Sequence, residues 1–236
     1  MTKPSRSRSY RGFLAAAFVC VTSAYANELI FTDDFETGDT SAWSKARNLT
    51  AANVNRENPF NGAYSLEIIP ANGKAALQDN SPRREDDFIV TFRLNPNDLS
   101  LQELPRPRLE ILRAIGGKKP WMRLAIAQLT KNRFGVELRL RQNDGRYRRL
   151  KGGTIRRNDW TEVTIFCTRA GTNGSDQGQA EIYTDGVLRT RRENLDNSEF
   201  TVDTVRFGLP AGSKGLESAV GTFYLDDFSS FRTLAP

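Results

Sequence analysis

The residues of this sequence best suited to chemistry are arginines interleaved with aromatic rings in one basic stretch, residues 105–157. The stretch holds 16 Lys and Arg residues and three acidic ones, a net charge of +13. Arginine offers planar, paired N–H donors that match carboxylate and sulfate groups, and aromatic rings can stack on sugar faces. The composition therefore predicts binding of an anionic polysaccharide. The candidate ligand-binding residues are Trp121, Arg123, Arg139, Arg141, Tyr147 and Arg149.

A period-two alternation of apolar and polar residues predicts the strands that carry these side chains. In one run the apolar residues alternate with Arg139 and Arg141, and in an earlier run they alternate with Trp121 and Arg123. Successive side chains of a strand point to opposite faces of the sheet. If these strands pair in order, the arginines and two aromatic rings lie together on one open sheet face.

A plain alternative is a solvated basic face that is neutralised by the acidic remainder of the same protein. Outside the basic stretch, and leaving out residues 1–26, there are 14 basic and 25 acidic residues, a net charge of −11. The preference for arginine and the interleaved aromatic rings favour the binding hypothesis. Nucleic acid would use the same chemistry, but the export signal described below makes it an unexpected partner. Lipopolysaccharide and acidic capsule are further candidates.

The catalytic chemistry open to the chain is limited, because the sequence contains no histidine. This excludes Ser-His-Asp and Cys-His nucleophiles, His-ligated metals and imidazole bases. Hydrolysis of a glycosidic bond needs two carboxylates about 5–9.5 Å apart, and the basic stretch contains only Glu110, Glu137 and Asp144 as acids. Glu137 shares a strand face with Arg139 and Arg141, which predicts an ion pair rather than catalysis.

The enzymatic alternative is a polysaccharide lyase that acts on uronic-acid polymers. Such a lyase neutralises the carboxylate with a cation or an amide and removes the C5 proton with Tyr, His or Lys, so only Tyr or Lys is available here. Positive charge from Arg146, Arg148 and Arg149 would lower the pKa of Tyr147. Strands are enriched in tyrosine in any case, so we favour a plain strand residue and non-catalytic binding. A third class is a structural envelope protein whose basic face contacts another protein or lipopolysaccharide.

Residues 1–26 have the three parts of a secretory signal peptide. Basic residues precede an apolar run over residues 13–21, and Ala24-Tyr25-Ala26 forms an A-x-A cleavage site. The apolar run is far shorter than the ~20 residues of a membrane span. Cleavage would lower the net charge from +6 to +2 and leave one cysteine, Cys167, which we expect to be a buried, unreactive thiol. We therefore expect a secreted or periplasmic protein in which residues 27–236 form one domain without a transmembrane span, and its oligomeric state stays open.

Short strand-like runs separated by turn signals recur through the expected domain. Residues 87–94 and 160–167 alternate with period two. Turns are marked by Asn143-Asp144-Gly145 and Asp185-Gly186, whose residues tolerate the positive φ angles of tight hairpins. No long segment has a convincing 3.6-residue period. The sequence therefore predicts an all-β fold, an antiparallel β-sandwich or jelly roll.

Acidic residues cluster at both ends of the expected domain. Asp34 and Glu36 lie near its start, and Asp226 and Asp227 lie near its end. Chain ends are often neighbours, and Ca²⁺ takes six to eight oxygen ligands from carboxylates and backbone carbonyls. These residues therefore predict a structural calcium site, with acidic turn residues at strand ends as the alternative. Asp226 and Asp227 point to opposite faces of a strand, so only one of them would contribute its side chain.

Several segments carry a family resemblance, which spans nearly the whole of the expected domain. They are residues 33–38 with Trp43, residues 61–68, residues 160–163, residues 181–186 and residues 224–228. These segments resemble the concanavalin A-like lectin/glucanase superfamily, which includes laminin-G-like domains and carbohydrate-binding jelly rolls.

The resemblance implies a jelly-roll fold of the concanavalin A-like type and a structural calcium held by Asp34, Glu36 and Asp226 or Asp227. Members of the superfamily include sugar-binding modules, glycoside hydrolases and polysaccharide lyases. This sequence lacks the Glu-x-Asp-x-x-Glu run of the laminarinase-type hydrolases. The preferred function is therefore that of an exported carbohydrate-binding protein.

Overall fold

The computed structural model of the chain describes residues 27–101, 108–117, 119–172, 177–210, 216 and 219–233. The predicted signal peptide lies outside these residues. In chain order the elements of the described part are β1 (Asn27–Asp33), β2 (Lys45–Arg47), β3 (Ala52–Asn55), β4 (Ser65–Ile68), the 3-10 helix η1 (Pro70–Asn72), β5 (Ala76–Asp79), β6 (Asp87–Asn95), β7 (Arg108–Gly116), β8 (Lys119–Thr130), β9 (Arg133–Arg141), β10 (Tyr147–Arg156), β11 (Thr161–Thr168), β12 (Gly178–Thr184), β13 (Val187–Leu195), β14 (Thr204–Gly208) and β15 (Phe223–Thr233).

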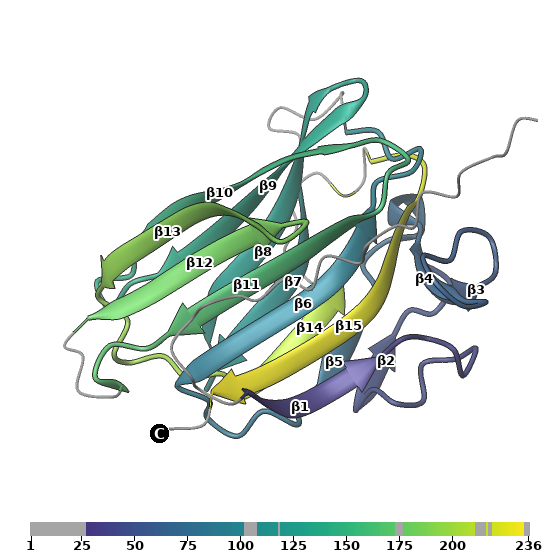
Figure 1. Ribbon diagram of the computed structural model, residues 1–236. Coiled ribbons are helices and arrows are strands. Elements are labelled where there is room, and N and C mark those ends of the chain that lie inside the picture. The colour runs from purple at the N-terminus through teal and green to yellow at the C-terminus, as the bar shows by residue number, and fades with distance from the viewer. Residues whose placement is uncertain are drawn as a thin grey trace, which may run out of the picture.

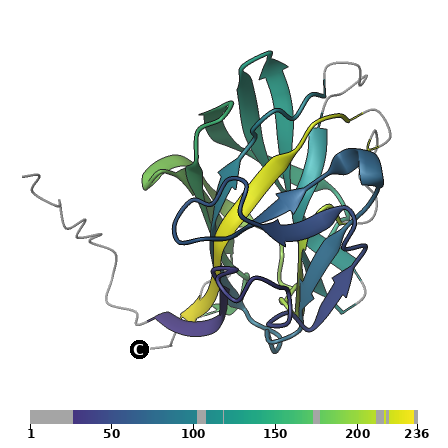
Figure 2. The ribbon, with the colours of Figure 1, turned by 90° about the vertical axis from the view of Figure 1, so that its right-hand side faces the viewer.

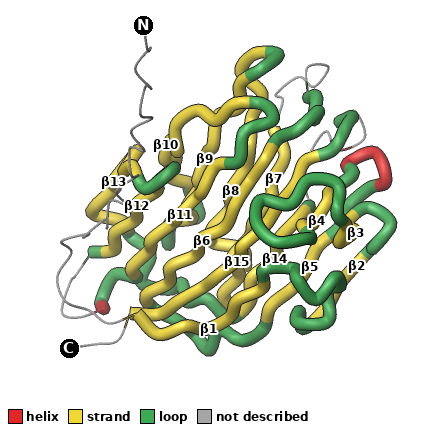
Figure 3. Tube along the Cα trace, turned by 45° about the vertical axis from the view of Figure 1, so that its right-hand side comes forward, coloured by secondary structure: helices red, strands yellow, loops and turns green. Residues whose placement is uncertain are grey.

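These strands form two antiparallel sheets that pack face to face (Figure 1). Sheet A has the strand order β13-β12-β11-β6-β15-β4-β3, and β1 also pairs with β15. Sheet B has the order β10-β9-β8-β7-β14-β5-β2. Figure 2 faces the end of the sandwich where β2, β3 and β4 lie, and Figure 3 shows that strands make up nearly all of the regular structure. The arrangement confirms the predicted all-β, antiparallel β-sandwich.

The alternation that predicted the strands is seen directly in their burial. Along β11 every second residue is buried and the residues between are half-buried, and β9 behaves in the same way after its first residue. The predicted hairpin turn between β12 and β13 has φ values of 50° at Asp185 and 71° at Gly186. Positive φ at both central residues is the geometry of a type I′ turn, which matches the right-handed twist of paired strands. The predicted turn is therefore confirmed.

A cluster of aromatic rings joins the two sheets in the middle of the core. The ring of Phe207, on sheet B, lies 5.0 Å from Phe92 and 4.9 Å from Phe228, both on sheet A. Trp43 stacks on Phe207 at 6.0 Å and donates its indole N–H to the Asp33 carboxylate at 2.6 Å. This hydrogen bond satisfies the one polar atom of the indole in an otherwise apolar cluster.

The predicted buried thiol is confirmed, because Cys167 on β11 is 1% exposed and belongs to the core. Burial, with a smaller contribution from the Glu181 carboxylate, raises the pKa of Cys167 above its ordinary value. The thiolate that would act as a nucleophile is therefore disfavoured. Within the described ranges, no helix is both long enough and apolar enough to span a membrane.

Candidate functional site

A row of cationic side chains crosses the outer face of sheet B, one from nearly every strand. The pairing register sets Arg149 opposite Arg139, Arg139 opposite Arg123, and Arg123 opposite Arg113. It continues from Arg113 to Arg206, from Arg206 to Gln78 on β5, and from Gln78 to Lys45 on β2. We call these seven residues the cationic row: Lys45, Gln78, Arg206, Arg113, Arg123, Arg139 and Arg149.

The row is straight because residues directly opposite each other in a sheet point to the same face. Neighbouring strands lie about 4.8 Å apart, so seven strands carry the row over about 29 Å. The apolar neighbours of its members, such as Leu138, Leu140 and Met122, point inward and are fully buried. The same alternation that builds the core therefore turns the arginines outward.

Two glutamates partly neutralise the centre of the row. The Glu137 carboxylate lies 2.5 Å from the Arg139 guanidinium and 3.2 Å from that of Arg108, which confirms the predicted ion pair at Glu137. Glu110 lies 2.5 Å from Arg113 and 3.8 Å from Arg123. Each glutamate therefore has two arginine partners, which orients the arginines and makes these carboxylates poor candidates for acid–base catalysis.

Two arginine N–H groups of the row are left without partners in the described structure. Arg123 Nε and Arg139 Nη2 are buried and donate to no acceptor among the described residues. A buried donor without a partner costs about 1–3 kcal/mol. A bound anion or an ordered water would relieve that cost.

The structure brings most of the predicted ligand-binding residues together. Arg123, Arg139 and Arg149 lie in the cationic row, and Tyr147 pairs with Arg141 on the same face. The Arg123 guanidinium lies 5.2 Å from the centre of the Tyr147 ring, which is 37% exposed. These residues form a continuous surface over β8, β9 and β10, and their role in binding stays a prediction.

Trp121 does not provide the open aromatic surface that the alternation predicted. Its side chain is only 2% exposed, because the ring of Phe200 stacks on it at 6.4 Å. Its indole N–H donates to the backbone carbonyl of Thr201 at 2.9 Å. The expectation was wrong because residues 200 and 201, far away in the sequence, cover this end of β8.

Four members of the row were not among the predicted residues. Arg113 was missed because β7 has a bulge between Glu110 and Leu112, which puts positions 110 and 113 on one face despite their odd spacing. Arg206, Gln78 and Lys45 lie outside the basic stretch and join the row only through the strand order of sheet B. The bulge has no clear signal in the sequence, whereas the alternation around Arg206 could have marked its outward side.

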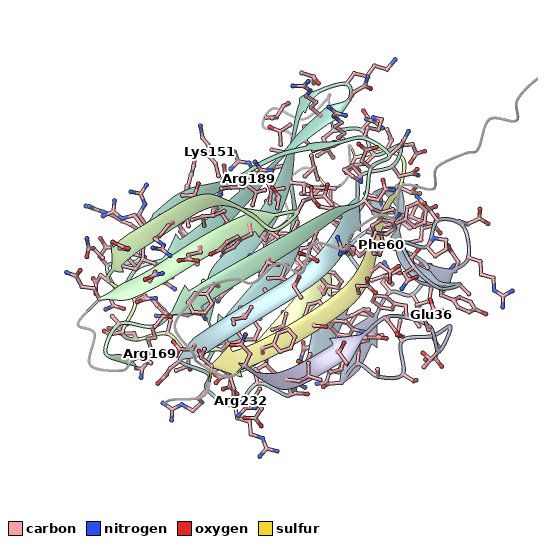
Figure 4. All side chains as sticks on the ribbon, in the orientation of Figure 1. Glu36, Phe60, Lys151, Arg169, Arg189 and Arg232 are labelled. Atoms are coloured by element: carbon pink, nitrogen blue, oxygen red, sulfur yellow. The ribbon has the colours of Figure 1, made fainter. Side chains whose placement is uncertain are left out.

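Positive charge also continues around the edge where the two sheets meet. Lys151 on β10 and Arg189 on β13 both lie at this edge (Figure 4). The Thr190 hydroxyl donates to the Lys151 carbonyl at 2.7 Å and so ties the two edge strands together. Arg189 packs against Gly153, whose φ of 83° marks the bulge that bends β10 toward sheet A.

The predicted calcium residues come close enough to affect one another's pKa. The Glu36 carboxylate accepts hydrogen bonds from the Ala63 and Tyr64 amides at 2.8–3.0 Å, and Figure 4 shows Glu36 beside the loop it holds. Burial raises the pKa of Asp226 to about 7, although it accepts hydrogen bonds from two backbone amides, and the charges of Asp227 and Glu36 add to the rise. These hydrogen bonds hold the loop at residues 58–64 against both ends of the domain.

The candidate residues do not form a closed metal site in this geometry. The described ranges contain no group of three or more Cys, Asp or Glu residues placed to hold one ion. Burial raises the pKa of Asp227 as well, and Asp34 and Glu36 contribute to that rise. Mutual repulsion of these carboxylates would favour a cation near them, so calcium remains a prediction.

Stability should fall as pH rises from about 4 to about 7 in the presence of a chelator. Burial raises the pKa of Asp33, Asp87 and Asp226 in the folded state. Over that range the folded state therefore binds more protons than the unfolded state, and stability falls with rising pH. Each unit of pKa difference corresponds to about 1.4 kcal/mol. Asp226 alone should therefore lower the free energy of unfolding by several kcal/mol over this pH range. Urea unfolding at pH 5 and pH 7.5 checks this, and a higher midpoint at pH 7.5 would contradict it.

Calcium should reverse this loss if the acidic ends of the domain bind it. Millimolar Ca²⁺ at pH 7.5 is expected to raise the urea midpoint of the wild type, because an ion that binds only the folded state stabilises it. Mg²⁺, which prefers a tighter octahedral shell, serves as the control cation. Ca²⁺ should raise the urea midpoint of the Glu36→Gln variant by less than that of the wild type. An unchanged wild-type midpoint would remove the calcium hypothesis.

The comparisons with known proteins identify the fold. No protein-family model and no curated protein matches the sequence. Among solved structures, the chain is similar to an alginate lyase from Chlorella virus, with a TM-score of 0.58 and 8% identity over 87% of this chain and 100% of that one. It is similar to a carbohydrate esterase from the Shiga toxin-encoding bacteriophage phi24B (TM-score 0.55, 12% identity, 89% and 100% covered). A third is the alginate lyase Aly36B, solved as a mutant with an alginate tetrasaccharide (TM-score 0.54, 12% identity, 89% and 94% covered). The chain therefore has the concanavalin A-like jelly-roll fold that its sequence segments resemble.

Proposed function

We propose that this protein binds an anionic polysaccharide along the cationic row of sheet B. The observation that carries the proposal is the register, which sets six Lys or Arg residues and one Gln directly opposite one another across seven strands. The strand spacing of about 4.8 Å is similar to the advance of one pyranose unit along an extended chain. A polymer that lies across the strands can therefore present its acidic groups to successive arginines.

The chemistry of the row suits carboxylate or sulfate groups better than neutral sugars. Hydrogen bonds to charged groups contribute about 1.5–3 kcal/mol each, and the planar guanidinium can bind an oxyanion through two of them. The Tyr147 ring, 37% exposed beside Arg123, offers an aromatic face for a sugar ring. Carbohydrate as the ligand class is further supported by fold neighbours that are named as alginate lyases and a carbohydrate esterase.

A lyase is the second candidate, because Tyr147 lies beside the arginines that would neutralise a uronate. Its phenol donates to the backbone carbonyl of Pro120 at 3.4 Å, which turns the hydroxyl group along the strand edge. A base needs its oxygen free to accept the C5 proton. Non-catalytic binding therefore agrees better with this geometry.

Affinity electrophoresis in gels that contain polysaccharide tests the proposed function. Pectate, alginate or a sulfated glycosaminoglycan should retard the protein, and added salt should weaken the retardation because exposed charges are screened. A neutral glucan should have no effect. Equal retardation by the neutral glucan, or retardation that ignores salt, would overturn the proposal. Duplex DNA and lipopolysaccharide in parallel gels show whether another polyanion is preferred.

The lyase is tested by the ultraviolet absorbance of unsaturated uronate products. No rise in absorbance is expected with the same acidic polymers. If the absorbance rises with the wild type but not with the Tyr147→Phe variant, the protein is a lyase and Tyr147 takes part in the reaction. A rise that persists in that variant would place the activity at another residue.

We also propose that the protein is exported and begins at Asn27 after cleavage. The A-x-A site at residues 24–26 and the short apolar run before it support this. N-terminal sequencing of the protein recovered from a bacterial host's periplasm or medium should start at Asn27. Recovery of an uncleaved chain from the cytoplasm would contradict the proposal.

A further inference from the structure

A pocket opens at the end of the cationic row farthest from Tyr147. It has a volume of about 190 Å³ and lies where β2, β5 and β14 meet. Its lining residues are Arg47, Lys74, Ala75, Ala76, Gln78, Arg206 and Leu209. Two of these, Gln78 and Arg206, belong to the row, so the pocket opens on the same sheet face.

The pocket carries positive charge that the described residues do not neutralise. Three of its lining residues are cations, and no ion pair within the described ranges joins Arg47, Lys74 or Arg206 to a carboxylate. Burial, and then the charges of Arg47 and Arg113, lower the pKa of Arg206. The centre of the row differs, because Glu110 and Glu137 hold ion pairs there.

A hydrogen-bond chain fixes the direction of the Arg206 side chain. Its Nε donates to the side-chain oxygen Oε1 of Gln78 at 2.9 Å, and the side-chain amide of Gln78 donates to Oδ1 of Asn80 at 2.8 Å. Gln78 thereby uses its acceptor on Arg206 and its donor on Asn80. Among the residues that the structure describes, no acceptor pairs with the terminal N–H groups of the guanidinium, which are therefore available to a ligand. An arginine held in this way is pre-organised for an oxyanion.

The rest of the lining is apolar and the space is small. Ala75, Ala76 and Leu209 supply hydrocarbon surface beside the cations. The volume is below the roughly 300–1,000 Å³ of a pocket for a drug-sized ligand. A ligand of matching size therefore has one acidic group and one compact, partly apolar body, which describes a single acidic sugar unit.

We propose that this pocket binds one acidic sugar unit, whose carboxylate or sulfate group pairs with Arg206 and Arg47. The pocket is the anchoring subsite of the polymer site, and this inference therefore rests on the proposed function. Its cations form no ion pair with the carboxylates of the described residues, so an anion gains more here than at the centre of the row, where glutamates compete. The polymer then extends from the pocket across β7, β8 and β9.

Ligand-observed NMR of the purified protein with monosaccharides tests the pocket without a polymer. Glucuronate and N-acetylglucosamine 6-sulfate are the two acidic probes, and their relative affinities distinguish carboxylate from sulfate. Glucose is the neutral control. At least one acidic probe should receive saturation transfer, and glucose should not.

Two variants of different kinds locate the binding. Arg206→Gln removes the charge and keeps much of the volume, whereas Ala76→Leu fills the pocket and keeps every charge. Each should weaken binding of the acidic monosaccharide by about tenfold or more, since a charge-assisted hydrogen bond is lost or blocked. Arg192→Gln, an exposed position on β13 outside the row, should keep the wild-type monosaccharide affinity. If circular dichroism shows that one pocket variant is unfolded, the affinity of the other variant tests the pocket.

The possible failures separate the pocket from the proposed function. If both pocket variants bind the acidic monosaccharide like the wild type, the inference is wrong. The inference is also wrong if no monosaccharide binds although acidic polymers still retard the wild type in a salt-dependent way. In that case the proposed function stands. If acidic polymers do not bind either, the proposed function fails with it.

Discussion

Replacing both Arg123 and Arg149 by glutamine should weaken binding of an acidic polysaccharide by about 100-fold or more. Each arginine is expected to contribute one charge-assisted interaction of about 1.5–3 kcal/mol, and about 1.4 kcal/mol corresponds to a tenfold change in affinity. The fold should survive, because Arg149 is exposed. When Arg123 is replaced, the Glu110 carboxylate keeps its ion pair with the Arg113 guanidinium, 2.5 Å away. Isothermal titration calorimetry with a defined acidic oligosaccharide measures the loss.

The matched control removes the same charge from other surfaces. Arg84 and Arg192 are exposed and lie outside the cationic row, so the Arg84→Gln/Arg192→Gln protein should keep its affinity to within a few-fold. A purely non-specific attraction would depend on net charge, and the affinity for the polysaccharide would then fall equally in both double variants. Equal weakening would therefore contradict a binding site at the row.

Replacing Phe207 by alanine should reduce the free energy of unfolding by about 3–5 kcal/mol, the usual cost of deleting a buried aromatic ring. Phe207 is fully buried and its ring contacts those of Trp43, Phe92 and Phe228. In a domain of this size, 1 kcal/mol shifts the melting temperature by about 2–4 °C, so the midpoint should fall by about 6–20 °C. Differential scanning calorimetry measures this shift.

Phe60 provides the matched control for that variant. Its ring is 38% exposed and rests edge-on against Trp160, with the Arg93 guanidinium 4.3 Å from its centre. Phe60→Ala should therefore cost no more than about 2.5 kcal/mol, the upper sum expected for a surface cation–π contact and one aromatic contact. Similar losses in the two alanine variants would mean that the rings at Phe207 do not form the centre of the core.

The sequence was sufficient to predict the fold class because one physical rule governs most strands. Alternation assigned an inward side to Leu138 and Leu140 and an outward side to Arg139, and these assignments match their burial. The turn at Asp185 and Gly186 was equally local, since positive φ at both positions requires residues that tolerate it. Local patterns of this kind need no knowledge of which strands are neighbours.

The complete row could not be predicted, since it depends on long-range pairing. Nothing in the sequence near Arg206 shows that β14 lies between β5 and β7, yet this order makes Arg206 the neighbour of Arg113. The failure at Trp121 has the same cause, because its cover, Phe200, is about 80 residues away in the chain. Strand alternation predicts which side a residue faces, but not which distant segment covers that side.

NMR of the arginine side chains can show directly whether an anionic polymer lies along the cationic row. Acidic oligosaccharide is added to ¹⁵N-labelled protein, and the Nε–Hε signals are followed. Signals of the row, at Arg206, Arg113, Arg123, Arg139 and Arg149, are expected to shift together, while that of Arg192 on β13 stays in place. Shifts confined to arginines of sheet A, or no shift under conditions where the polymer binds, would contradict binding along the row.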